Sequence, residues 1–174
     1  MIRRSGLIQF KGKDATIIGD DVKPGDLAPE FVVQTQNWEP FQGLAQTAGK
    51  VRIIAAVPSL DTEVCDRETR RFNQEAASLS EDIVILVISM DLPFAQKRWC
   101  GAAGIDRVIV LSDHMQADFG EKYGCLIEEA RLLRRAVFVV DRNDRIVYTE
   151  YLPALGLEPN YQAVLQAAQS ALVG

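Results

Sequence analysis

Two continuous apolar runs constrain the fold of this chain more than any other feature of its sequence. They are Val51 to Val57, in which Arg52 is the one charged residue, and Ile83 to Ile88. A strand with one wet face alternates apolar and polar residues, whereas a continuous run is typical of a strand buried on both faces. Such strands require helices on both sides of a sheet, so the sequence predicts an α/β fold.

Helical signals follow the first run and lead to a third expected strand at Val108 to Leu111. Pro58 ends the first run, and Asp61 or Thr62 is expected to cap a helix that begins near Val64. Alternation of strands and helices is the pattern of βαβ units, which join parallel strands. The core of the sheet is therefore expected to be parallel.

Three more segments carry helical signals, namely a Pro at a first turn, a Gly after a last turn, or an apolar stripe. They are a segment that Pro93 opens and that carries Cys100, the segment Met115 to Tyr123, and the segment Tyr161 to Leu172.

Two hairpins are expected, one near each end of the chain. Residues 1–20 are expected to pair Leu7 to Phe10 with Thr16 to Ile18 around a turn at Gly12-Lys13-Asp14. Ala136 to Val140 is expected to pair with Ile146 to Tyr151. The antiparallel pair makes the central sheet mixed, and 174 residues suit one domain that spans residues 1–174.

Composition and charge exclude several classes of partner. The net charge of −5 argues against a nucleic-acid partner, because such proteins carry a basic patch or stripe. No apolar stretch approaches the roughly 20 residues needed to span a bilayer, so no membrane partner is expected. The basic start at Met1 to Gly6 is not followed by the apolar run of a signal peptide. A cytoplasmic location is therefore expected.

The chain has three cysteines, Cys65, Cys100 and Cys125. An odd number at wide spacing is not the framework of a disulfide-stabilised secreted domain, so burial, metal binding or redox chemistry remain. His114 is the one histidine and no ligand pair has suitable spacing, so no metal is expected and His114 is interpreted as a loop residue. No glycine-rich phosphate loop occurs, and no cofactor is expected.

Cys65 holds the position at which chemistry is most expected. It follows the end of a strand and lies at the start of a helix, where unpaired N–H groups and a partial positive charge stabilise a thiolate. Thr62 lies one turn earlier and Pro58 can wall a pocket. Position alone also fits a small buried apolar residue, which is the commoner role of a single cysteine.

Three ordered motifs carry a resemblance to a known family. Pro58-Ser59-Leu60-Asp61-Thr62-Glu63-Val64-Cys65 resembles the peroxiredoxin signature, in which Pro, three residues, Thr and two residues precede the cysteine. Met90 to Gln96 with Arg98-Trp99-Cys100 resembles the resolving-cysteine segment of the thiol peroxidase branch, and Arg135-Ala136-Val137 resembles its arginine-bearing strand. The resemblance covers nearly the whole chain.

The resemblance implies a thioredoxin-like fold and a peroxidase that reduces hydrogen peroxide and organic hydroperoxides. It implies that Cys65 attacks the peroxide and becomes a sulfenic acid. Thr62 would hydrogen-bond the thiolate and the peroxide, Arg135 would stabilise the thiolate and orient the peroxide, and Pro58 would shape the pocket. Cys100 would resolve the sulfenic acid as an intramolecular disulfide. A thioredoxin-type reductant and a homodimer are also implied.

The chain departs from the branch at two positions beside the expected thiols. Glu63 stands where proline is common, and it is expected to face solvent so that its charge does not oppose the thiolate. Trp99 differs from the aromatic residue expected before Cys100. Cys125 has no role in the pattern and is interpreted as a packing residue.

Two rival functions use the same cysteines. A thioredoxin-type dithiol oxidoreductase would suit the fold, but the chain contains no Cys-x-x-Cys. A redox sensor that passes oxidation to a partner protein remains open, because it would need the same two thiols.

Overall fold

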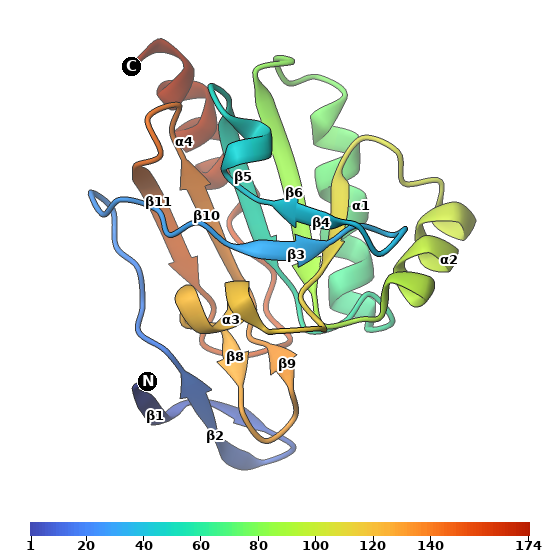
Figure 1. Ribbon diagram of the computed structural model, residues 1–174, viewed down its shortest axis with the longest axis vertical. Helices are drawn as coiled ribbons and strands as arrows, with labels where there is room; N and C mark the ends of the chain where they lie inside the picture. Colours follow the sequence, from blue (N-terminus) through green and yellow to red (C-terminus); the bar gives the residue numbers. More distant parts are fainter.

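The computed structural model describes residues 1–174 and shows a seven-stranded mixed sheet with helices on both faces (Figure 1). The order of the strands is β11-β10-β5-β6-β7-β3-β4. Three parallel strands form its centre, and antiparallel strands complete it on both sides. Their bounds are β5 Val51–Ala56, β6 Ile83–Ser89, β7 Ile109–Ser112, β10 Ala136–Val140, β11 Ile146–Tyr151, β3 Val32–Gln34 and β4 Pro40–Gln42.

Four helices and one 3-10 turn cover this sheet. The residues of α1, α2 and α4 share one apolar core with one face of the central strands, and those of α3 share another core with the opposite face. Their bounds are α1 Glu63–Ala76, α2 Pro93–Ala103, α3 Asp118–Lys122, α4 Tyr161–Val173 and η1 Ala45–Thr47. No helix has the length and apolarity that a membrane span requires.

Strand β5 shows why its sequence is continuously apolar. Ile53 and Ala55 pack in the core beneath α1 and α4, whereas Ile54 and Ala56 pack in the core on the other face. Arg52 is fully buried, but its guanidinium donates to Thr47 Oγ1 and to the carbonyl oxygen of Asp141, each at 2.8 Å. The single charge in the run is therefore satisfied rather than exposed.

A second, small sheet projects from the lower end of the molecule in Figure 1. Its order is β1-β2-β8-β9, so the N-terminal hairpin pairs with a second hairpin from the far half of the chain. The bounds are β1 Arg3–Phe10, β2 Lys13–Ile18, β8 Leu126–Ile127 and β9 Leu132–Leu133. This pairing brings Phe10 and Leu132 into the lining of one pocket.

The expected α/β architecture and its central strands are confirmed, with three local differences. The first hairpin turns at Lys11 and Gly12, both with positive φ, rather than at Gly12-Lys13-Asp14, because a two-residue turn of this kind suits the strand twist. The helix expected from Met115 is shorter, since Ala117 has a φ of 53° and Asp113 accepts hydrogen bonds from the first turn. The short strands β3, β4, β8 and β9 were not expected.

Candidate active site

Cys65 lies in the first turn of α1, which follows the carboxyl end of β5 after a six-residue loop. Its side chain is fully buried. The loop before it is held by Asp91, whose carboxylate accepts hydrogen bonds from Ser59 Oγ at 2.7 Å and from the backbone N–H of Leu60 at 2.9 Å. The end of β6 therefore fixes the loop that delivers Cys65 to the helix start.

Arg135 reaches the same point from the neighbouring strand. Strand β10 runs antiparallel to β5 and pairs Ala136 with Ala56, so the start of β10 lies beside the end of β5. The Nη2 atom of Arg135 donates to Cys65 Sγ at 3.2 Å, and the arginine is 1% exposed. Its Nε and Nη2 atoms also donate to the carbonyl oxygen of Leu155 at 3.1 and 2.8 Å, which fixes the plane of the guanidinium.

Glu68 is a member of the site that the sequence reasoning missed. It lies on α1 one turn beyond Cys65, is fully buried, and accepts a hydrogen bond from Arg135 Nη1 on Oε1 at 3.1 Å. Its Oε2 atom has no hydrogen-bond partner. Burial raises the pKa of Glu68 to about 7, against the opposing effect of Arg135. The signal in the sequence was its spacing of three residues from Cys65, which places both on one helix face.

Thr62 and Pro58 lie beside the site. Thr62 is the N-cap residue of α1, but its hydroxyl donates to the carbonyl oxygen of Ser59 at 2.9 Å, and no hydrogen bond joins it to Cys65. Pro58 is buried and forms part of the pocket wall. Glu63 turns outward with its side chain 88% exposed and pairs with Arg67, which confirms the expectation that it faces solvent.

A pocket of about 270 Å³ opens beside this cluster. Apolar side chains from four separate parts of the chain make most of its wall, and Arg135 connects it to the sulfur of Cys65. The lining residues are Phe10, Pro58, Thr62, Glu63, Val64, Leu132, Arg135, Leu155 and Gly156.

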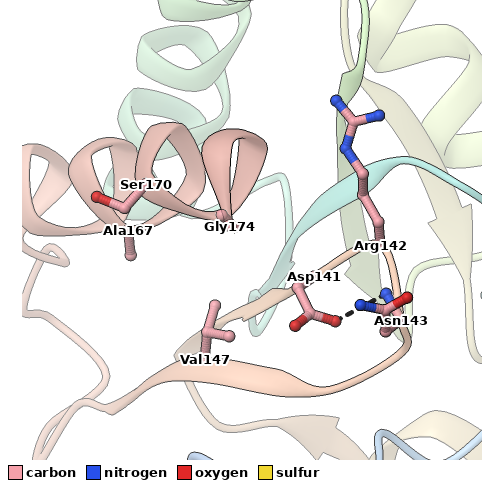
Figure 2. A pocket seen from close by; sticks show the side chains of 8 residues that line it. Asp141, Arg142, Asn143, Val147, Ala167, Ser170 and Gly174 are labelled. Carbon is pink, nitrogen blue, oxygen red and sulfur yellow. Dashed lines mark hydrogen bonds between the residues drawn. The ribbon is translucent and has the colours of Figure 1, made fainter.

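A second hollow, of about 310 Å³, lies at the other end of β10, between its turn into β11 and the end of α4 (Figure 2). Asp141 borders it, but this carboxylate accepts hydrogen bonds from the backbone N–H groups of Asn143 and Arg145 and thus holds the turn. It contains no thiol, so the chemistry expected from the sequence does not belong there.

Cys100 shares the core of Cys65 and is 6% exposed. Its Sγ accepts a hydrogen bond from Gln36 Nε2 at 3.5 Å. Burial raises the pKa of the Cys100 thiol, and this hydrogen bond acts in the opposite direction. Trp99 stands beside it, and the guanidinium of Arg70 on α1 lies 5.7 Å from the centre of its ring.

Cys125 lies in the core on the opposite face of the sheet. It is fully buried, and burial raises the pKa of its thiol to about 12. The sheet therefore separates it from the two other cysteines, and all three thiols are free.

Comparison with known proteins adds independent evidence. The redoxin family model matches residues 23–165. The chain belongs to the redoxin family. It is 57% identical over 158 residues to a thiol peroxidase of Oceanobacillus iheyensis, which spans 91% of this chain and 95% of that protein. It is 52% identical over 163 residues to a thiol peroxidase of Bacillus subtilis, across 94% of this chain and 96% of that protein.

Two solved structures superimpose on this fold. A peroxiredoxin-like protein from Aquifex aeolicus superimposes with a TM-score of 0.86 at 39% identity, covering 96% of this chain and 98% of that one. AhpC of Mycobacterium tuberculosis superimposes with a TM-score of 0.71 at 21% identity, over 88% of this chain and 94% of that one, which shows the fold alone. The resemblance to the thiol peroxidase branch and the thioredoxin-like fold are thereby confirmed.

The buried carboxylate of this redoxin generates a prediction about stability. Glu68→Gln is expected to raise the free energy of unfolding, relative to the wild type, by more at about pH 8 than at about pH 5. The pKa of Glu68 is about 7 in the folded chain against an ordinary value of 4.5. The stabilising contribution of the proton is therefore complete below about pH 4.5 and is lost as the pH rises through about 7. Glutamine does not titrate, so the variant escapes that loss.

Denaturant unfolding of both proteins at the two pH values measures this difference. Glu63→Gln is the matched control, because it removes an exposed carboxylate from the same helix. A stability difference between Glu68→Gln and the wild type that is equal at both pH values would contradict the assignment.

Proposed function

We propose that this redoxin is a thiol peroxidase that reduces hydrogen peroxide and organic hydroperoxides through Cys65. The observation that carries the proposal is the 3.2 Å hydrogen bond from a buried arginine, Arg135, to the sulfur of a cysteine at a helix start. A cation and a helix N-terminus both favour the thiolate, which is the nucleophilic form of cysteine. The thiol peroxidase names of the relatives support the same activity.

In the first step the Cys65 thiolate attacks the nearer oxygen of the peroxide. A sulfur–oxygen bond forms, the oxygen–oxygen bond breaks, and the departing oxygen takes a proton to leave as water or an alcohol. Cys65 is left as a sulfenic acid. Arg135, fixed by the Leu155 carbonyl, holds its donors where charge develops on the peroxide, which is how preorganised groups accelerate such a step.

Thr62 and Pro58 have supporting roles in this proposal. Thr62 borders the pocket, and its hydroxyl would have to leave the Ser59 carbonyl before it could donate to the thiolate or the peroxide. Pro58 shapes the wall of the pocket and limits the access of water to the site.

Cys100 resolves the sulfenic acid by forming an intramolecular disulfide with Cys65. Both residues belong to one core on one face of the sheet, whereas Cys125 is on the other face. A disulfide requires Cα atoms within roughly 4.4–6.8 Å of each other, so one or both helices must partly unwind wherever the reduced separation is larger. A thioredoxin-type dithiol then restores both thiols by exchange.

The proposed function also includes a cellular location and an oligomeric state for the enzyme. We place it in the cytoplasm, where a reducing environment recycles such disulfides. We also propose a homodimer, and the exposed side chains of Leu92, Phe94 and Met115 provide apolar surface for association. Analytical ultracentrifugation determines that state directly.

Substitution of each of the three cysteines is expected to give a different result in a peroxide-consumption assay coupled to thioredoxin and its reductase. Cys65→Ser removes the nucleophile and should lower the rate to that of the uncatalysed reaction. Cys100→Ser should keep stoichiometric oxidation of Cys65 but lose thioredoxin-linked turnover. Cys125→Ala should retain turnover, because its thiol lies in the opposite core.

Normal turnover by Cys100→Ser would show that Cys100 is not the cysteine that resolves the sulfenic acid. Oxidation of Cys65 without turnover in the wild type, together with a mixed disulfide to another protein, would support the redox-sensor function instead.

The apolar wall predicts a change in substrate preference on removing one side chain. Phe10→Ala is expected to lower kcat/KM for cumene hydroperoxide about tenfold, which corresponds to about 1.4 kcal/mol of lost apolar contact. Hydrogen peroxide has no apolar part to contact Phe10, so its kcat/KM should stay within about twofold. Steady-state kinetics with both peroxides measures the ratio.

Leu7→Ala is the matched control, because Leu7 lies on the same strand, is 43% exposed and does not line the pocket. An equal loss for both peroxides in Phe10→Ala would mean that Phe10 supports the structure of the site rather than the binding of the organic group.

A further inference from the structure

The turn between β3 and β4, residues Thr35 to Glu39, lies against helix α2, which carries Cys100. The ring of Trp38 is 5.2 Å from the ring of Phe94, and Lys97 Nζ donates to Asn37 Oδ1 at 3.3 Å. The turn is thus attached to the helix through the two residues that directly follow Gln36.

The turn also has an internal framework that fixes its conformation. Thr35 Oγ1 accepts hydrogen bonds from the N–H groups of Asn37 and Glu39 at 3.3 and 3.2 Å. The N–H group of Thr35 donates to the carbonyl oxygen of Glu39 at 2.8 Å. Gln36 follows Thr35 directly, so its backbone is held in place by these bonds, and its side chain is half-buried.

The amide of Gln36 is directed at the sulfur of Cys100. Its Nε2 atom lies 3.5 Å from Sγ, and no other side chain hydrogen-bonds this sulfur. Cys65 receives a charged donor from Arg135, whereas Cys100 has only this neutral one in an apolar core. Burial raises the pKa of the Cys100 thiol and so disfavours the thiolate. A hydrogen-bond donor at the sulfur acts in the opposite direction, because it stabilises the thiolate.

We propose that Gln36 is a catalytic residue of the disulfide-forming step, in which its amide stabilises the Cys100 thiolate as it attacks the Cys65 sulfenic acid. The proposal rests on the proposed function, since it assumes that Cys65 and Cys100 form the disulfide. It adds to that function a group that touches the second reacting sulfur and that belongs to neither cysteine motif.

The step balances without any further reactant. The lone pair of the Cys100 thiolate forms the sulfur–sulfur bond as the sulfur–oxygen bond of the sulfenic acid breaks. The oxygen leaves as hydroxide and takes up a proton to become water. Cys100 is oxidised, and the sulfur of Cys65 is reduced from the sulfenic to the disulfide level.

Single-turnover kinetics with Gln36→Leu tests the proposal. Reduced protein is mixed with one equivalent of hydrogen peroxide and quenched at intervals, and mass spectrometry separates the Cys65 sulfenic acid, trapped by dimedone, from the Cys65–Cys100 disulfide. Loss of a hydrogen bond to a charged group is expected to slow conversion of sulfenic acid to disulfide by about tenfold. Gln36→Lys restores a donor and should restore the rate.

The matched control is Asn37→Ala, which removes the contact between the turn and Lys97 without touching the sulfur. It should form the disulfide at the rate of the wild type. Equal slowing by Asn37→Ala and Gln36→Leu would overturn the proposal, because the turn would then act only as a support for α2. A disulfide rate in Gln36→Leu equal to that of the wild type would overturn it as well.

A second readout is independent of peroxide. In a Cys65→Ser background, the ultraviolet absorbance of the Cys100 thiolate is followed against pH. Gln36→Leu should move this titration to higher pH and Gln36→Lys to lower pH. An unchanged titration would contradict the role of the amide. If the wild type formed no Cys65–Cys100 disulfide at all, both the resolving step and the role of Gln36 would be wrong. If only the role of Gln36 were wrong, the disulfide would still form in the wild type and in every Gln36 variant.

Discussion

The charge balance around one buried arginine determines how the rest of the site works. Arg135 is almost completely buried, and a buried cation is costly unless anions and hydrogen-bond acceptors surround it. The carbonyl oxygen of Leu155 and the Glu68 carboxylate supply part of that environment, and the sulfur of Cys65 supplies the rest. One cation therefore faces two groups that can be anionic. Burial raises the pKa of Glu68 to about 7, so a proton taken up by Glu68 near neutrality removes one of the two negative charges that can pair with Arg135.

Sheet topology brings these groups together and keeps the third cysteine apart. The carboxyl end of β5 and the beginning of antiparallel β10 meet at one edge, which places Cys65 beside Arg135. Asp91, beyond the end of β6, holds the loop before Cys65 and stands two residues before the helix that carries Cys100. One residue thus ties the loop before Cys65 to the start of the helix that carries Cys100. Cys125 is separated from both by the sheet itself.

Periodicity and motifs predicted the layers of this fold, because strands buried on both faces, such as β5 and β6, have continuously apolar sequences. Strands of two or three residues, such as β8, are too short to show a pattern in the sequence, and only their pairing with other strands defines them. The same limit applies to the site. Cys65 was indicated by its position after a buried strand and by the resemblance to known motifs, and Arg135 by that resemblance alone. Glu68 and Gln36 are polar residues that no motif marks. Their contacts with Arg135 and Cys100 depend on distant parts of the chain.

Cys65, beside Arg135, is the thiol that we propose peroxide oxidises first. The most direct test adds one equivalent of hydrogen peroxide to the reduced protein, blocks free thiols within seconds, and maps the peptides by mass spectrometry without reduction. We expect a dominant Cys65–Cys100 link and an unmodified Cys125. A free Cys65 thiol at the end of the reaction would show that Cys65 is not the residue that peroxide oxidises. A Cys65–Cys125 link would keep the nucleophile and remove the role of Cys100.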